Sequence, residues 1–109
     1  MKDYTKTKEY KGIKKALMIY LEETKNNNPY FIGLVEDYMD LYVIKNQLRD
    51  DIMERGVVCI YQNGETQWGY KRNDSVGELN KVSTQMLRIL SQLKIEPNKL
   101  EPIEEDDEL

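Results

Sequence analysis

The sequence predicts a mainly α-helical fold: an antiparallel helical hairpin with a short β-hairpin inserted at its bend, preceded by a short basic helix. The chain has 109 residues, which is enough for one hydrophobic core. Charged residues make up 33% of it, above the share of about a quarter in an average domain, and this favours long solvated helices. Apolar residues recur at helical spacing in three stretches, and two short strand-like runs flank Asn63-Gly64.

The first helix is expected over residues 11–25. Its apolar face is built at spacings of three and four by Ile13, Leu17, Tyr20, Leu21 and Thr24. The run Asn26-Asn27-Asn28-Pro29 then ends the helix, because asparagine tolerates turn geometry and Pro29 cannot continue a helix that begins before it.

The second helix is expected to begin at Pro29 and to end at Arg55. Asn28 can cap its first free amides, Pro29 fits the first helical position, and Gly56 suits the residue just past the end. About 27 residues at 1.5 Å each give a helix of roughly 40 Å.

This long helix carries two apolar stripes. Heptad-like steps define a seam of Phe31, Leu34, Tyr38, Leu41, Leu48 and Ile52. A second stripe contains Ile32, Val35, Met39 and Val43. Contacts with the first and third helices would explain two buried sides, and so would contact with a neighbouring copy of the chain. Because one partner helix cannot cover both stripes, we expect a homo-oligomer that forms through the seam.

A β-hairpin is expected over residues 57–70. Asn63 and Gly64 both tolerate positive φ, which predicts a two-residue type I′ turn between the strands VVCIYQ and ETQWGY. That turn would set three cross-strand pairs: Cys59 with Trp68, Tyr61 with Thr66, and Val57 with Tyr70. Cys59 is then a small strand hydrophobe rather than a catalytic thiol, since the chain has no histidine to activate it.

The third helix is expected to begin at a capping box. Ser75 and Glu78 stand at the spacing of that motif, and Asp74 adds negative charge at the helix start. An apolar seam follows, made of Val76, Leu79, Ser83, Met86, Leu90 and Leu93. The helix is expected to end before Pro97.

The two ends of the chain carry opposite charge, although the net charge is only −4. Residues 1–15 contain six lysines against two acids, and residues 94–109 contain two lysines against seven acids. The basic end predicts a DNA-binding surface made of Lys2, Lys6, Lys8, Lys11, Lys14 and Lys15. The acidic end predicts a tail that is unstructured in isolation and docks a protein partner through Ile103 and Leu109. Solubilising tails are the alternative reading of both ends.

Several kinds of chemistry are excluded by residue type. The absence of histidine removes Ser-His-Asp and Cys-His catalysis and histidine-ligated zinc, and a single cysteine cannot build a thiolate cluster. Gly64 and Gly69 have a phosphate-loop spacing, but Tyr70 follows where a lysine is required. We therefore expect a binding or assembly protein that is no enzyme and needs no cofactor or metal.

A metal-dependent nuclease is the remaining catalytic alternative. Its ligands would come from Asp50, Asp51 and Glu54, or from Glu36, Asp37 and Asp40. Arg49, Arg55 and Lys45 lie among these acids, so solvated ion pairs explain them better.

From Tyr70 to Pro97, YKRNDSVGELNKVSTQMLRILSQLKIEP, the sequence resembles phage terminase small subunits of the short, helical-hairpin kind. Members show a long helix that ends near a glycine, a small β excursion, a Lys-x-Asn-Pro type helix opening and an amphipathic helix closing in Leu-Gly-Leu-x-Pro. Here the opening motif reads Lys71-Arg72-Asn73-Asp74, and the closing motif reads Leu93-Lys94-Ile95-Glu96-Pro97. Asp74 replaces the usual proline, and Lys94 replaces the usual glycine. The order of elements agrees from Pro29 to Pro97.

The resemblance implies a role in viral DNA packaging. Small terminase subunits bind double-stranded viral DNA, assemble into rings and present that DNA to a large subunit, which holds the ATPase and nuclease. On this reading the chain divides into a basic arm and helix (residues 1–28), a helical-hairpin oligomerisation core (residues 29–96) and an acidic tail (residues 97–109) that docks the large subunit. The alternative is a homo-oligomeric helical scaffold or regulator without nucleic-acid binding. With a mean hydropathy of −0.74 and no long apolar run, no membrane partner is expected, and we expect the protein in the host cytoplasm.

Overall fold

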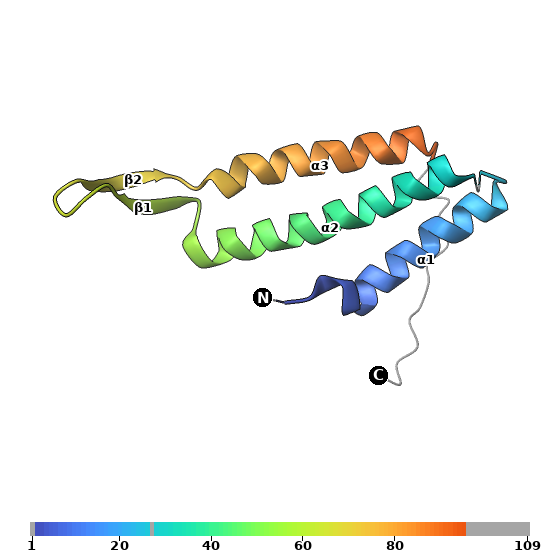
Figure 1. The fold of residues 1–109 in the computed structure, drawn as a ribbon, viewed down its shortest axis with the longest axis horizontal. Coiled ribbons are helices and arrows are strands. Elements are labelled where there is room, and N and C mark those ends of the chain that lie inside the picture. The colour runs from blue at the N-terminus through green and yellow to red at the C-terminus, as the bar shows by residue number, and fades with distance from the viewer. Residues whose placement is uncertain (1, 27, 96–109) are drawn as a thin grey trace.

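Three helices and one β-hairpin make up the fold in a computed structural model, which describes residues 2–26 and 28–95. In Figure 1, α2 lies between α1 and α3, and the hairpin extends beyond the helices at the bend between α2 and α3. The elements, in chain order, are the 3₁₀ turn η1 (Tyr4–Lys6), α1 (Lys8–Glu23), α2 (Pro29–Arg55), β1 (Val58–Gln62), β2 (Trp68–Arg72) and α3 (Asp74–Gln92). This arrangement confirms the predicted fold class.

Helix α1 begins three residues before the predicted start. The Thr7 side chain accepts a hydrogen bond from the backbone N–H of Tyr10 at 3.1 Å, and this caps the helix at Lys8. At the other end the helix stops at Glu23, and Lys25 adopts a left-handed φ of 61°. The sequence prediction overlooked Thr7 because it followed apolar spacing alone, and Lys8 and Glu9 precede the first apolar residue of the face.

Helix α2 has the predicted bounds. The Asn28 side chain accepts from the backbone N–H of Phe31 at 3.2 Å, and Pro29 occupies the first turn. Gly56 follows the helix with φ 84°, a conformation that side chains other than glycine rarely adopt. Local residue chemistry therefore decides both ends of this helix.

The core lies along α2, where α1 and α3 pack against it. Its buried members are Tyr4, Leu17, Leu21, Val35, Met39, Tyr42, Met86, Leu93 and Ile95. The fully buried positions on α2 are Val35 and Met39 of the second stripe together with Tyr42. The predicted seam is half-buried in this single chain, and Phe31, Leu34, Tyr38 and Leu41 pack against the core.

The hairpin is present, but its predicted register is wrong. β1 and β2 are antiparallel, with Cys59 opposite Lys71 and Ile60 opposite Tyr70. The connection spans residues 63–67, closed by the N–H of Asn63 donating to the carbonyl of Gln67 at 2.6 Å, so it is longer than a two-residue turn. At the base of the hairpin, the N–H of Asn73 donates to the carbonyl of Val57 at 2.7 Å. Both of these bonds hold the observed register.

Asn73 also caps α3, where Ser75 was predicted to do so. Its side-chain oxygen accepts from the N–H of Ser75 at 2.9 Å, and the helix therefore begins at Asp74. The Ser75 hydroxyl donates instead to Asp51 on α2, at 2.7 Å. The predicted capping box was therefore wrong. Asparagine caps a helix as well as serine does, and Asn73 stands two residues before Ser75.

A polar cluster, Asp51, Arg55, Asn73 and Ser75, joins the end of α2 to the start of α3; we call it the junction cluster. The Asn73 side chain is 0% exposed, donates to Asp51 Oδ2 at 3.1 Å and to the Gly56 carbonyl at 2.9 Å, and accepts from Arg55 Nη2 at 3.0 Å. Asp51 also accepts two hydrogen bonds from the Arg55 guanidinium, at 2.7 and 2.8 Å. The guanidinium, with Ser75 and Asn73, holds the pKa of the Asp51 carboxyl well below its usual range.

Replacing Asn73 with alanine should lower the free energy of unfolding by about 2–4 kcal/mol, because the change removes a helix cap and leaves a buried carbonyl without its donor. Urea unfolding followed by circular dichroism measures the loss. Asn80→Ala is the matched control, since Asn80 is exposed on α3, and its effect should stay within about 0.5 kcal/mol. Equal effects of the two substitutions would show that the junction cluster carries no special share of the stability.

Candidate nucleic-acid interface

The six predicted DNA-binding lysines are all exposed, and they lie on one continuous segment. Lys2 precedes η1, Lys6 belongs to it, and Lys8, Lys11, Lys14 and Lys15 follow on α1. On α1 the four lysines span about a third of the helix circumference at 100° per residue. Around the same helix, Lys14 lies about 20° from the buried Leu21, whereas Lys8, Lys11 and Lys15 lie about 80° or more from it. Lys8, Lys11 and Lys15 therefore point away from the core, Lys14 borders it, and all four are exposed so that they can approach one backbone together.

The two acids of this segment are bound within the protein. The Asp3 carboxylate accepts hydrogen bonds from the hydroxyl and the N–H of Thr5, which lower the pKa of Asp3, and it lies 4.0 Å from the Lys6 amine. The carboxylate of Glu9 accepts a hydrogen bond from the Tyr42 hydroxyl on α2. Both acids keep their negative charge, and the segment is net positive because six lysines stand against two acids.

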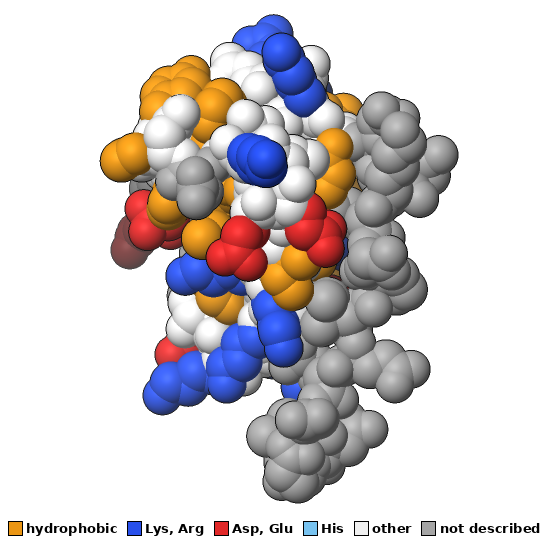
Figure 2. Space-filling view, turned by 90° about the vertical axis from the view of Figure 1, so that its right-hand side faces the viewer, with side chains coloured by type: hydrophobic (Ala, Val, Ile, Leu, Met, Phe, Trp, Pro, Cys, Tyr) orange, Lys and Arg blue, Asp and Glu red, His pale blue; other side chains and the backbone are white. Residues whose placement is uncertain are grey.

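Cations are not confined to α1. Figure 2 looks at the molecule from the end opposite the hairpin and shows Lys and Arg side chains both at the bottom, the level of α1, and at the top, the level of α3, with acidic side chains between them. On α3, Lys81 and Arg88 line a shallow hollow of about 320 Å³ with Asn80, Thr84 and Gln85. This second group was not predicted, because its two cations stand seven residues apart and form no run in the sequence.

Three tyrosines fix the basic segment onto α2. The Tyr4 hydroxyl donates to Asp50, the Tyr42 hydroxyl donates to Glu9, and the rings of Tyr10 and Tyr42 meet edge to face at 5.9 Å. Burial and the bond to Glu9 raise the pKa of Tyr42 to about 12, and the bond to Asp50 raises the pKa of Tyr4. None of these three tyrosines was predicted as a contact; the available signal was the placement of Tyr4 and Tyr10 among the charges of the basic segment.

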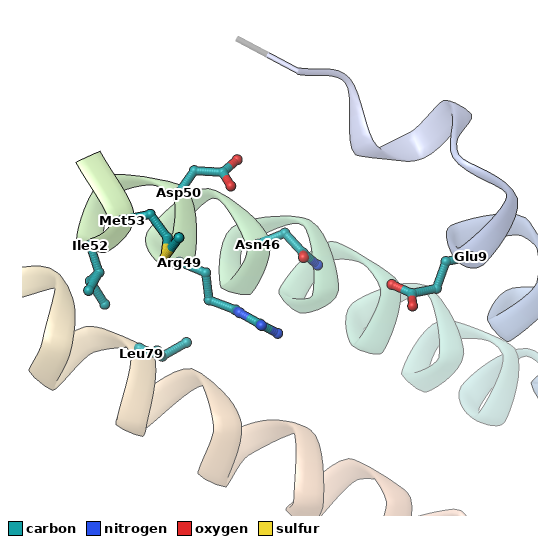
Figure 3. Close-up of a pocket in the computed structure, with 7 residues that line it drawn as sticks. All are labelled: Glu9, Asn46, Arg49, Asp50, Ile52, Met53 and Leu79. Atoms are coloured by element: carbon teal, nitrogen blue, oxygen red, sulfur yellow. The ribbon is translucent and has the colours of Figure 1, made fainter.

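A cleft of about 540 Å³ lies between the start of α1, the end of α2 and the start of α3 (Figure 3). Its lining consists of Glu9, Asn46, Arg49, Asp50, Ile52, Met53 and Leu79. Both carboxylates of the cleft accept tyrosine hydrogen bonds, and the Arg49 guanidinium is the cation among them. Such a mixed, open surface suits contact with polar groups and offers no concentrated charge of one sign.

Two acids of the nuclease alternative, Asp50 and Asp51, have other partners here. Asp51 belongs to the junction cluster, and Asp50 accepts from Tyr4. Within the described part of the chain, no group of three or more His, Cys, Asp or Glu side chains is placed to hold a metal ion. None of the helices in residues 2–26 and 28–95 combines the length and the hydropathy of a membrane span. The predicted tail anchors Ile103 and Leu109 lie outside the described residues.

Comparison with known families gives one match. The family model described as "Phage terminase, small subunit" matches residues 10–107, which is nearly the whole chain. No curated protein and no solved structure matches.

Tyr42→Phe should lower the free energy of unfolding by about 1 kcal/mol at neutral pH, because it removes the hydrogen bond to Glu9 and keeps the ring. Because the pKa of Tyr42 is higher in the folded state than in the unfolded state, its neutral phenol makes its full contribution to stability below about pH 10. This contribution is lost as the pH rises toward 12. The difference between the wild type and the variant should therefore shrink over that range in chemical unfolding. Tyr30→Phe is the control, since that side chain is exposed. A difference that does not depend on pH would contradict the assignment.

Proposed function

The chain belongs to the phage terminase small-subunit family, and from this we propose that it is a DNA-binding, oligomeric adaptor that delivers viral DNA to the large terminase subunit for packaging. The family match over residues 10–107 is the observation that carries the proposal. By the same family relation the large subunit supplies ATP hydrolysis and DNA cleavage, so we propose that this chain catalyses no reaction and acts in the cytoplasm of the infected host.

The basic segment on η1 and α1 is the proposed DNA contact. Its lysines suit the phosphate backbone as point charges, whereas base reading usually uses bidentate Arg, Asn or Gln. One subunit should therefore bind weakly and with little sequence preference. Copies joined in a closed assembly would multiply the contacts, since each phosphate neutralised steepens the dependence of log affinity on log salt by about 0.9.

The overall charge of −4 supports the second candidate, a scaffold without nucleic-acid binding. Exposed charges are screened beyond about 8 Å at physiological salt, so a basic helix on one side of an acidic protein can still hold a phosphate backbone. A measurement of DNA binding decides between the two functions.

The Lys11→Glu, Lys15→Glu double variant should bind duplex DNA at least on the order of tenfold more weakly at low salt, with a salt slope smaller by about 1.8. Fluorescence anisotropy over a salt series measures both. The matched control is Lys81→Glu, Arg88→Glu, which changes the net charge equally on the exposed surface of α3. A larger loss in the control would move the DNA contact to α3. If the wild-type protein binds no DNA even at low salt, the DNA-binding function is excluded and the scaffold function is favoured.

Deletion of residues 101–109 should preserve assembly and DNA binding but abolish binding to the large subunit, because the tail is the proposed dock. Ile103→Ser, Leu109→Ser separates the apolar anchors from the acids, which this variant keeps. Calorimetric titration with the purified large subunit measures the interaction. Full affinity after the deletion would reduce the tail to a solubilising segment.

A further inference from the structure

One face of the hairpin is exposed and has no partner among residues 2–26 and 28–95. The register places Val58, Ile60, Trp68 and Tyr70 on the same side of the ribbon, and their exposed fractions are 56%, 66%, 61% and 68%. The rings of Trp68 and Tyr70 meet edge to face at 6.1 Å. We call these four side chains the hairpin face.

On the opposite side of the ribbon Cys59 is the buried residue, while Tyr61 is 44% exposed. Cys59 is buried there, 3.8 Å from the Arg55 guanidinium, and the Tyr61 ring lies against Gly69, where an added Cβ would come within 3.2 Å of it. The junction cluster thus holds the hairpin from one side and leaves the hairpin face outward. Both strand edges are also unpaired among the described residues, because the sheet has two strands.

From this geometry we infer that the hairpin face packs against the hairpin of a second copy of this chain. The inference rests on the proposed oligomeric function and names the hairpin face as a surface through which two copies of the chain would make contact. A two-stranded hairpin is marginal in water unless something covers it, and Figure 1 shows the hairpin standing clear of the helices. A second hairpin offers what is missing here: an apolar face together with an open strand edge.

The exposed area fits such a contact. Two aromatic and two aliphatic side chains at these exposures present roughly 500 Å², the size of patches that mark interaction sites. Two copies would bury roughly 1,000 Å² in total, the lower limit for a biological interface, and edge pairing would add to it. DNA is a poorer occupant, because Arg72 is the one charged residue in register with the face and the phosphate backbone needs several cations.

The chain has one tryptophan, Trp68, so its fluorescence reports on this face alone. Native mass spectrometry gives the assembly state, and acrylamide quenching is measured on the same samples over a dilution series. We expect an oligomer in which quenching of Trp68 is at least threefold weaker than after dissociation. An oligomer whose Trp68 is fully quenchable would overturn the inference and leave the proposed oligomer intact. A monomeric wild type would overturn both.

Ile60→Lys tests the face while keeping Trp68 as the reporter. We expect a lower assembly state and full quenching, with unchanged helical circular dichroism. Leu87→Lys is the matched control, because Leu87 on α3 is 68% exposed and lies away from the hairpin; it should change nothing. An Ile60→Lys protein that assembles with Trp68 still protected would refute the contact. Protection of Trp68 that requires added duplex DNA would refute it too and would assign the face to DNA.

Discussion

The buried side chain of Asn73 is the contact on which the arrangement of the elements depends. It caps α3, accepts from Arg55 at the end of α2 and donates to the carbonyl of Gly56, while its backbone N–H pairs with Val57 at the base of the hairpin. An amide with 0% exposure must satisfy its donors and acceptor internally, and the end of α2, Gly56 and the start of α3 supply those partners here. The hairpin is therefore oriented by the same residue that begins the last helix.

The features that depend on neighbouring residues alone could be predicted from the sequence. Asn28-Pro29 and Gly56 gave both ends of α2, and Asn63-Gly64 located the hairpin loop. Prediction failed where a distant residue decides: the strand register depends partly on the Asn73–Val57 bond, whose partners lie far apart along the chain. A neutral asparagine in a polar stretch carries no sign that it will be buried.

The candidate interface was likewise predicted in part: its lysines were predicted from the sequence, and the contacts that attach it to the core were not. Lysines are visible as charge, and the structure leaves all six exposed on one segment. The attachment of that segment was not visible, because Tyr4 reaches Asp50 across 46 positions and Tyr42 reaches Glu9 across 33. Hydrogen bonds of this range depend on how α1 crosses α2, and apolar periodicity gives the buried side of each helix without giving that crossing.

These tyrosine bonds also fix the positions of two acidic side chains. Each ties a carboxylate close to the basic segment, Glu9 or Asp50, to a neutral phenol. The bond to Asp50 raises the pKa of Tyr4, and burial together with the bond to Glu9 raises the pKa of Tyr42. A DNA phosphate then competes with fewer mobile carboxylates of this chain for the lysines, although both acids keep their negative charge. For a chain of net charge −4, such local separation is the physical condition for holding DNA at all, since the field of the remaining surface repels it. The bonds that attach α1 to the core therefore fix the positions of two carboxylates whose charge remains, and the positive potential that the proposed function requires comes from the six lysines of the segment.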